Sequence, residues 1–379
     1  MTLRVAHIIP QLSHGGAEQL TLNIHHALNN KTKVQSKLFY FQPVADYGPP
    51  ELLGTQFLPA QVQLRLFSGL QGQVEELEAG IRAYSPQILH CHLYESELIR
   101  ACFKPGPWAH ISTVHDNMRQ LAPSSSFPHK PYWIQRASRT TLFRSFRQTR
   151  NHFLAISEDT RNYLQQVLPA DMHPRIALLK NAIPLNRFAF PERPDWQPGQ
   201  TLRLINVGSF VPKKNQGFAL DVLQELLKLG IDTQLSLAGD GPLKSQVQQQ
   251  AEAKGVLNRC SFLGNVQNIE AHYRLADLYL HTAWEEPFGL VLVEAMASGL
   301  SVVALDAGGN RELIQDGING RLLPRQACPS EVAISIQTWM SQATTQHNAR
   351  KKALEFAADF GMPAYVDALL NHYAQLQPA

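Results

Sequence analysis

The sequence of residues 283–299 reads Ala283-Trp284-Glu285-Glu286-Pro287-Phe288-Gly289-Leu290-Val291-Leu292-Val293-Glu294-Ala295-Met296-Ala297-Ser298-Gly299. Pro287 and Gly289 keep the first part of this segment non-helical. The apolar run that follows predicts a helix over residues 290–298, and Gly299 is a residue type favoured just after a helix C-terminus. Strand-like runs flank the segment on both sides, so it has the form of the connection in a βαβ unit.

Strands and helices of this kind alternate along the whole chain. Strands are predicted at residues 5–9, 88–91, 111–114, 153–156, 202–207, 233–238, 278–281 and 301–305. Further helices are predicted at residues 17–28, 96–102 and 217–229. Strands that alternate with helices of about 10–15 residues indicate βαβ units and parallel sheets.

A proline-rich stretch interrupts this alternation. Residues 184–199 contain four prolines and show no amphipathic period, which is typical of a linker. The chain has 379 residues, enough for two domains at a prior of roughly 150 residues each. We therefore predict an α/β protein with two Rossmann-like domains, at residues 1–185 and 200–360, joined by a linker at 186–199.

The composition is that of a globular protein. Hydrophobic residues make up 44% of the chain and charged residues 17%, which excludes a disordered, collagen-like or disulfide-stapled protein. The sequence shows no apolar run near the roughly 18 residues needed to cross a bilayer. Its first residues predict a strand and lack the length and cleavage site of a signal peptide.

Cysteine usage and charge bear on the compartment and on partners. The four cysteines form neither a C-x-x-C pair nor a zinc-ligand pattern, so we expect a reducing, cytoplasmic location. Residues 1–185 hold 18 Lys and Arg against 12 Asp and Glu, a net +6; the remainder holds 16 against 19, a net −3. The first half is only mildly basic and matches no nucleic-acid-binding module, so nucleic acid is not an expected partner.

Ligands of open parallel sheets bind beyond the carboxyl ends of the strands, which directs attention to three loops. The loop with Gly15 and Gly16 opens a helix whose N-terminal N–H groups suit an anion, although a tight strand-to-helix turn explains it equally well. It is not a G-x-G-x-x-G motif, so a dinucleotide site is weakly indicated. The loop with Lys213 and Lys214 would place positive charge suited to a diphosphate; the alternative is a solvated loop.

The third loop carries Glu286, and the helix after it carries Glu294. Carboxylates suit sugar or ribose hydroxyls because each oxygen accepts hydrogen bonds. Acidic residues that complement the helix dipole are the alternative. That alternative explains Glu285 or Glu286 but not Glu294, which lies on an otherwise apolar helix.

Glu286 and Glu294, with seven residues between them, resemble the E-x7-E signature of the retaining GT-B glycosyltransferases of family 4. Further segments resemble that family in the expected order along nearly the whole chain. They are Gly15-Gly16, Ala155-Ile156-Ser157-Glu158, Asn181-Ala182-Ile183, Ala238-Gly239-Asp240-Gly241-Pro242-Leu243, Phe262-Leu263-Gly264-Asn265-Val266, Gly308-Gly309-Asn310-Arg311-Glu312-Leu313-Ile314 and Asp316-Gly317-Ile318-Asn319-Gly320.

The resemblance implies a GT-B fold, in which two Rossmann-like domains face a central cleft and the last helix, residues 363–377, packs back on the first domain. It implies that Glu294 holds the donor ribose, that Glu286 lies beside the donor sugar, and that Lys214 neutralises charge on the leaving nucleotide. His115 looks like the family's cleft histidine, which hydrogen-bonds the sugar while Asp116 fixes its tautomer. The implied catalytic residues are Glu286, His115 and Lys214.

The remaining implied donor-binding residues are Gly15, Gly16, Ser209, Lys213, Val266, Phe288, Gly289, Leu290 and Glu294. Backbone N–H groups at Gly16 and residues 288–290 would bind hydroxyls and diphosphate, and Val266 would face the base. The chain departs from the family at Ser209, where arginine is common, and at Asn215, where glycine is common. Lys213 is expected to supply the charge missing at Ser209. The resemblance implies no catalytic metal and no cofactor beyond the donor.

These features predict a retaining, metal-independent glycosyltransferase that moves a sugar from a nucleotide-diphosphate sugar to an acceptor hydroxyl. The expected acceptor is a carbohydrate or lipid-linked intermediate of cell-surface polysaccharide or lipopolysaccharide synthesis. Two alternatives stay open: a nucleotide-sugar 2-epimerase of the same fold, and a non-catalytic paralogue that binds a nucleotide sugar.

A basic helix is predicted within Arg136–Arg150. Its five arginines fall on one arc, with Leu142 and Phe146 beside it. Such a helix suits peripheral contact with the inner face of an anionic membrane, and equally an anionic lipid-linked acceptor. A solvated basic helix is the alternative.

Overall fold

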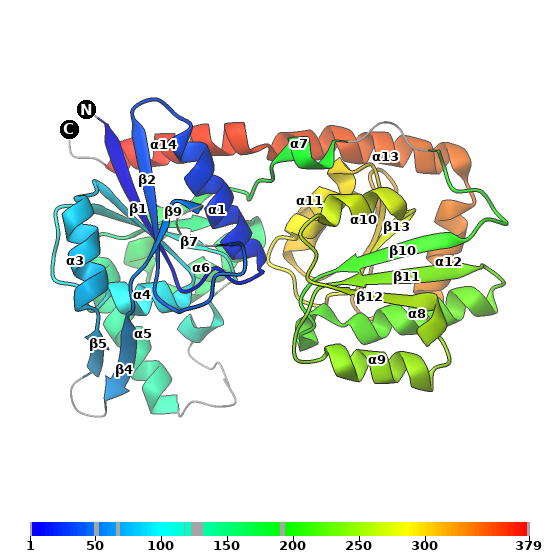
Figure 1. Cartoon of the computed structure of the whole chain (residues 1–379), viewed down its shortest axis with the longest axis horizontal. Coiled ribbons are helices and arrows are strands. Elements are labelled where there is room, and N and C mark those ends of the chain that lie inside the picture. The colour runs from blue at the N-terminus through cyan, green and yellow to red at the C-terminus, as the bar shows by residue number, and fades with distance from the viewer. Residues whose placement is uncertain are drawn as a thin grey trace. The chain divides into compact units, whose positions relative to one another are not determined.

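The computed structural model describes residues 2–48, 53–65, 69–116, 118–122, 132–189 and 194–376. The chain forms two units, Met1–Asn181 with Met362–Ala379, and Ala182–Gly361. Each unit contains one large parallel sheet with helices packed on it, as Figure 1 shows for each unit by itself. The predicted α/β class with two parallel-sheet domains is confirmed.

The first unit is built on seven parallel strands in the order β3-β2-β1-β6-β7-β8-β9. The strands are β1 (Leu3–Ile9), β2 (Val34–Tyr40), β3 (Thr55–Phe57), β6 (Ile88–His92), β7 (Ala109–Val114), β8 (His152–Ala155) and β9 (Ile176–Leu178). A separate antiparallel hairpin joins β4 (Gln61–Arg65) and β5 (Gly69–Gln73). All five residues of β6 are buried, as expected for a parallel strand covered on both faces.

Six α-helices are described in the first unit: α1 (Gly16–Asn29), α3 (Glu75–Tyr84), α4 (Tyr94–Arg100), α5 (Tyr132–Gln148), α6 (Glu158–Val167) and α14 (Met362–Leu376). The last of them comes from the end of the chain and packs against α1. Lys31, which follows α1, forms an ion pair of 2.5 Å with Asp367 of α14, and the phenol of Tyr373 reaches the buried ring of His90 on β6.

The second unit is built on six parallel strands in the order β12-β11-β10-β13-β14-β15. The strands are β10 (Leu202–Val207), β11 (Thr233–Ala238), β12 (Cys260–Gly264), β13 (Leu278–His281), β14 (Ser301–Leu305) and β15 (Arg321–Leu323). The helices are α7 (Leu185–Phe188), α8 (Gln216–Lys228), α9 (Lys244–Ala253), α10 (Ile269–Leu275), α11 (Leu290–Ala297), α12 (Pro329–Met340) and α13 (Ala343–Ala357).

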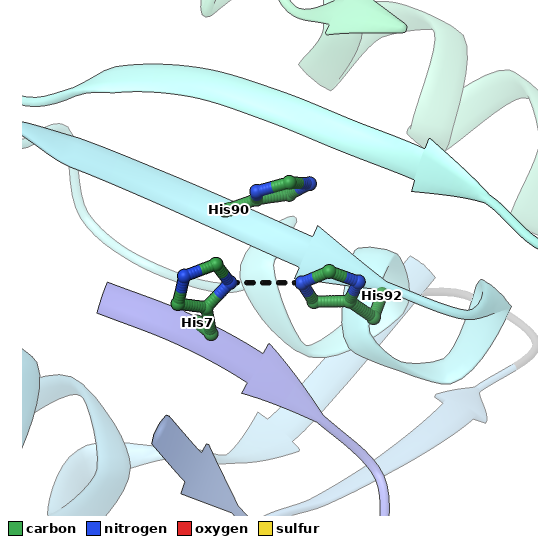
Figure 2. Close-up of side chains that lie close together, drawn as sticks. All are labelled: His7, His90 and His92. Carbon is green, nitrogen blue, oxygen red and sulfur yellow. Dashed lines mark hydrogen bonds between the residues drawn. The ribbon is translucent and has the colours of Figure 1, made fainter. Parts of the chain in front are cut away.

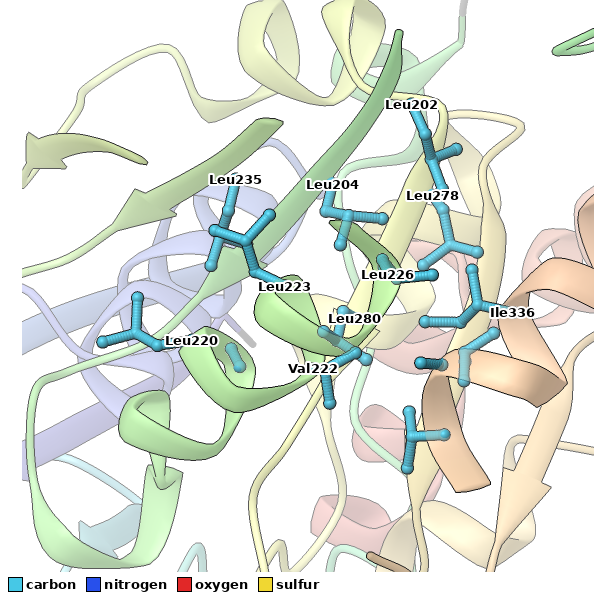
Figure 3. Packing of buried hydrophobic residues seen from close by; sticks show 14 of the residues in the cluster. Leu202, Leu204, Leu220, Val222, Leu223, Leu226, Leu235, Leu278, Leu280 and Ile336 are labelled. Atoms are coloured by element: carbon cyan, nitrogen blue, oxygen red, sulfur yellow. The ribbon is translucent and has the colours of Figure 1, made fainter. Parts of the chain in front are cut away.

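Figure 3 shows the core of the second unit, where leucines of three strands meet two helices. The strands contribute Leu202, Leu204, Leu235, Leu278 and Leu280, α8 contributes Leu220, Val222, Leu223 and Leu226, and α12 contributes Ile336. All of these side chains are 1% exposed or less. The hydrophobic effect therefore holds α8 and α12 on the sheet and fixes where the loops after the strands emerge.

The described residues of the proline-rich stretch, 184–189 and 194–199, belong to the second unit. The backbone N–H of Ile183 donates to the carbonyl of Phe360, and α7 packs against α11. Trp196 is buried in the core of this unit, and Asp195 pairs with Arg350 at 2.5 Å. Aromatic burial thus anchors a segment whose composition alone indicates a loop. Residues 190–193 lie outside the described residues.

Candidate functional site

The strand order of the second unit reverses between β10 and β13, and two loops leave the carboxyl ends of these strands side by side. The first loop follows β10 and contains a short 3-10 turn, Pro212–Lys214; the second follows β13 and contains Glu286. Two hydrogen bonds join them: Thr282 Oγ1 donates to the Lys214 carbonyl at 3.1 Å, and the Trp284 N–H donates to the Lys213 carbonyl at 3.1 Å. This is the edge at which ligands of open parallel sheets bind.

The first loop is held from within by a buried glutamine. The side-chain amide of Gln216 donates to the carbonyls of Gly208 and Ser209, at 3.2 and 3.0 Å. Asn215 has φ +51°, a left-handed conformation that asparagine tolerates better than most residues. This conformation accounts for an asparagine at the position where the family commonly has glycine.

A largely buried ion pair connects the two loops. Lys214 Nζ donates to Glu286 Oε2, and His281 Nε2 lies 3.5 Å from the same oxygen. The side chains of Lys214 and Glu286 are 17% and 10% exposed. A pair this well covered is screened weakly by solvent, so each charge strongly influences the other.

In this group of side chains, Lys214 carries a positive charge and Glu286 a negative charge. Burial alone would raise the pKa of Glu286, but Lys214 above all, with His281 and Lys213, holds that pKa below its usual value. Burial, partly opposed by the charge of Glu286 and aided by that of Lys214, lowers the pKa of His281 to about 4. At neutral pH Glu286 is therefore a carboxylate beside a cationic Lys214 and a neutral imidazole.

Close backbone contacts fix the position of Glu286. Its N–H donates to the Ala307 carbonyl at 2.8 Å, and its carbonyl accepts the N–H of Gly309 at 2.9 Å. Gly289, with φ +103°, turns the chain into α11. The first N–H groups of a helix have no partner within the helix, so the start of α11 offers donors next to the ion pair.

We expect Gly309→Ala to disturb this arrangement. A Cβ at Gly309 would lie 2.0 Å from the carbonyl oxygen of Pro287, a backbone atom that cannot move by itself. The variant should unfold about 1–3 kcal/mol more easily, as overpacked sites do, and exchange the Glu286 amide hydrogen faster. Chemical denaturation and hydrogen exchange measure both effects.

Gly217→Ala is the matched control for that prediction. Its Cβ would meet only the side-chain amide of Gln250, at 2.7 Å, and this flexible group can move away. If the Glu286 amide hydrogen of the Gly309→Ala protein exchanged at the wild-type rate, Gly309 would not hold the loop.

Glu294 lies on α11 in a second polar group. Its carboxylate accepts a hydrogen bond of 3.2 Å from the Tyr273 hydroxyl. Burial raises the pKa of Glu294 to about 7, partly offset by Tyr273 and by the charge of Arg187. Arg187 forms an ion pair of 2.9 Å with Glu270. Motif matching missed Tyr273 and Arg187, because no spacing links them to Glu294.

Glu286 and Glu294 act on a common neighbour. Burial raises the pKa of the Tyr279 phenol well above its usual value, and both carboxylates add to the shift. The two acids of the motif therefore share one electrostatic environment in the second unit. Of the other predicted residues, Phe288 and Gly289 are buried, Leu290, Lys213 and Val266 are partly buried, and Ser209 is exposed.

In the first unit, the glycine loop is covered by a side chain that the predictions omitted. Gly15 caps α1, and a Cβ added to it would lie 2.2 Å from Glu18 Oε2. Ser13 Oγ donates to the other carboxylate oxygen at 3.2 Å. The Glu18 side chain thus folds back over the helix start, near Gly16, where an anion was predicted. Acidic residues three positions after a cap commonly do this, which is the signal that could have found it.

His115 directly follows β7, and its hydrogen-bond partner differs from the predicted one. His115 Nε2 lies 3.0 Å from His92 Nδ1, whereas Asp116 Oδ1 accepts the N–H of Met118 at 3.2 Å. Burial lowers the pKa of His115 to about 3, so the ring is neutral. The prediction that Asp116 orients the ring does not hold in the structure, because its carboxylate closes a local turn.

Helix α5 carries Arg136, Arg139, Arg144 and Arg147, whereas Arg150 lies beyond its end, and apolar side chains of the helix pack within the unit. Leu142, Phe143 and Phe146 are buried in the first unit's own core. Arg147 pairs with Asp171 at 2.9 Å. The apolar face is therefore not available for insertion into lipid. Within the described ranges no helix is long and apolar enough to span a membrane.

Each of the two units matches a known protein family. Residues 14–187 match the family described as Glycosyltransferase Family 4, and residues 192–356 match the Glycosyl transferases group 1. The chain is 26% identical over 390 residues to the putative glycosyltransferase EpsF of Bacillus subtilis, covering 98% of this chain and 96% of that protein. It is 31% identical over 175 residues to the phosphatidyl-myo-inositol mannosyltransferase of Mycobacterium tuberculosis, covering 45% and 44%.

Solved structures show the same fold at low identity. Anabaena HepE in complex with UDP and glucose matches with a TM-score of 0.79 at 19% identity, covering 99% of this chain and 100% of that one. WaaG, a glycosyltransferase involved in lipopolysaccharide biosynthesis, matches with a TM-score of 0.73 at 15% identity, with the same coverage.

Proposed function

We propose, from the matches of residues 14–187 to Glycosyltransferase Family 4 and of residues 192–356 to the Glycosyl transferases group 1, that the chain transfers a sugar from a nucleotide-diphosphate sugar to an acceptor hydroxyl with retention of configuration. The observation that carries the proposal is the buried Lys214–Glu286 pair beside the start of α11. We further propose that the reaction needs no metal ion, because Lys214 and the helix N-terminus supply the positive charge that a diphosphate requires.

Lys214 has the central electrostatic role in this proposal. As the bond between the sugar and the diphosphate breaks, negative charge grows on the leaving diphosphate. A fixed cation in a site poor in water stabilises that charge more than the ground state, which is often the largest contribution to catalysis. The ammonium group of Lys214 already lies at Glu286, so it needs little movement to reach a phosphate oxygen near α11.

Glu286 acts as a carboxylate. An ionised acid can accept hydrogen bonds from sugar hydroxyls and stabilise the positive charge that develops at the anomeric carbon. It cannot supply a proton. We propose that the acceptor oxygen bonds to the face of the sugar from which the diphosphate leaves, and that the acceptor's proton passes to a diphosphate oxygen. This route explains retention without a covalent enzyme intermediate.

The first donor to test is UDP-glucose, because HepE has been crystallised with UDP and with UDP-glucose. The acceptor class we propose is a carbohydrate or lipid-linked intermediate of cell-surface polysaccharide or lipopolysaccharide synthesis. The names of WaaG and of the mycobacterial phosphatidyl-inositol mannosyltransferase support this class.

Donor turnover tests the proposal. The protein is incubated with UDP-glucose, with and without a panel of lipid-linked and free glycan acceptors, while UDP release and the anomeric signals of the product are followed by NMR. We expect UDP release that depends on an acceptor and a product with the donor's anomeric configuration. An inverted product would contradict retention. An epimerised donor without any acceptor would instead favour the 2-epimerase.

The ionisation of Glu294 gives a pH-dependent prediction for donor binding. Its pKa of about 7 means that it is protonated below pH 7 and ionised above it. The ionised form accepts ribose hydroxyls, so the Kd for UDP-glucose should fall about tenfold from pH 6 to pH 8, in proportion to the ionised fraction. UDP-glucose suits the test because its phosphates are diesters that do not titrate in this range.

Isothermal titration calorimetry at pH 6, 7 and 8 measures this effect. Glu294→Gln removes the titrating group and keeps its shape, so its Kd should change little over the same range. An equal pH dependence in the wild type and in this variant would assign the titration to another group.

A further inference from the structure

Four buried histidines line up on one face of the first unit's sheet. His7 on β1 pairs in register with His90 on β6, and His92 lies two residues further along β6, so their side chains share one face. His115 directly follows β7. The rings of His90 and His92 stack at 4.3 Å between centroids, and Figure 2 shows His7 linked to His92.

Three of these rings form a continuous hydrogen-bonded chain. His7 Nδ1 lies 2.9 Å from His92 Nε2, and His92 Nδ1 lies 3.0 Å from His115 Nε2. Both ring nitrogens of His92 are therefore used within the chain. At its inner end, His7 Nε2 is buried and has no hydrogen-bond partner among the described residues. At the other end, His115 uses its Nε2 for the bond to His92, so its Nδ1 takes no part in the chain.

All three imidazoles are neutral. Burial lowers the pKa of His7 and of His115 to about 3, with the nearby charge of His25 adding to the shift at His7. Burial also lowers the pKa of His92 well below its usual value. A neutral imidazole carries one N–H and one bare nitrogen. Two hydrogen bonds among three such rings can therefore run in only one of two directions along the chain.

The unpartnered nitrogen of His7 selects the direction. If His7 Nε2 carried the hydrogen, a buried N–H would have no acceptor, which is the rarer defect in folded proteins. If it is bare, His7 Nδ1–H donates to His92, His92 Nδ1–H donates to His115, and His115 carries its hydrogen on Nδ1. Both hydrogen bonds are then made, and the group left unsatisfied is a buried acceptor nitrogen, which costs less free energy than a buried N–H without an acceptor.

We propose that His7 and His92 are positioning residues that hold His115 as the neutral Nδ1–H tautomer, so that its ring can donate an N–H to an oxygen of a substrate. The part that concerns substrate rests on the proposed function. The tautomer does not, and it can be measured on the free protein.

A metal ion is the competing use of this cluster. One ring nitrogen from each of His7, His90 and His92 lies within 4.8 Å of the others. However, both nitrogens of His90 are already bonded, to Tyr373 Oη and to Thr113 Oγ1, each at 2.7 Å. A metal would have to break these bonds and the His7–His92 bond, so the hydrogen-bonded chain explains the arrangement better.

Histidine-selective ¹⁵N NMR of the full-length protein tests the proposal. We expect His115 in the Nδ1–H form in the wild type, and a mixture of tautomers in His92→Leu. Loss of one oriented hydrogen bond should also lower kcat/KM for UDP-glucose about tenfold. His7→Asn keeps an N–H donor near the Nδ1 position and should retain the wild-type tautomer, whereas His7→Leu should not. The comparison of His7→Asn with His7→Leu tests the proposal if His92→Leu fails to fold.

His90→Asn is the control, because His90 is equally buried but bonds to Tyr373 and Thr113 instead of to the chain. It should leave the tautomer of His115 unchanged. An Nε2–H tautomer in the wild type would overturn the proposal. A joint shift of the ¹⁵N signals of His7, His90 and His92 on addition of Zn²⁺ alone would also overturn the proposal. A correct tautomer in a protein without transferase activity would contradict only the proposed function.

Discussion

Replacing Glu286 by glutamine should lower kcat by a factor of about 10²–10³, the effect of removing one group that stabilises transition-state charge. The amide keeps the shape of the side chain but loses the negative charge that faces the developing positive charge on the sugar. Lys214 would keep a neutral acceptor, so we expect the free energy of unfolding to fall by only about 1–3 kcal/mol. Steady-state kinetics with UDP-glucose and chemical denaturation measure the two effects.

Glu285→Gln is the matched control, because it makes the same chemical change one residue earlier in the same loop. It should keep most of the wild-type kcat. The role of Glu286 would be refuted by a folded Glu286→Gln protein that transfers sugar at the wild-type rate. A loss of activity that merely follows the loss of folded protein would identify a structural role.

Lys214→Met should have a comparable effect on turnover and a larger one on stability. Without the ammonium group, the charge on the leaving diphosphate is no longer neutralised, and kcat should fall by about 10²–10³. The Glu286 carboxylate would stay buried without its cation, and removing one partner of a buried pair costs about 3–5 kcal/mol. The kinetic comparison must therefore be made at a temperature where denaturation curves show the variant fully folded.

Two further variants sharpen the test of Lys214. Lys228→Met removes an exposed lysine from α8 and should leave kcat unchanged. The double variant Lys214→Met/Glu286→Gln should be more stable than Lys214→Met alone, because no unpaired carboxylate remains. Its kcat should fall by less than the product of the two single effects, as expected for groups that act together. Independent, multiplicative effects would show that the ion pair is not a functional unit.

Much of the fold could be predicted because its signals are local. β10, β11, β13 and β14 begin and end at the predicted residues, since each is a short apolar run between turn-forming residues. The helix predicted at residues 290–298 is α11, which ends one residue earlier at Ala297 and has glycine on both sides, at Gly289 and Gly299. These elements position the loops of Lys214 and Glu286, so the core of the candidate site followed from sequence patterns.

What could not be predicted depends on contacts between distant segments. The hydrogen bond between His92, the last residue of β6, and His115, which follows β7, joins residues 23 positions apart, and no spacing rule indicates it. The proline-rich stretch was predicted to be a linker because prolines suggest a loop. In the structure, Trp196 and Asp195 tie this stretch to the second unit through residues more than 100 positions away in the sequence.

The measurement that tests the proposed function most directly is thermal stabilisation of the purified protein by UDP, GDP, ADP and TDP and by their common sugar conjugates. We expect one nucleotide and its sugar conjugate to raise the Tm selectively, since a ligand that binds only the folded state stabilises it. Lys214→Met should lose most of that shift. A folded wild-type protein whose Tm is unchanged by all of these ligands would contradict a nucleotide-diphosphate site at Lys214 and Glu286.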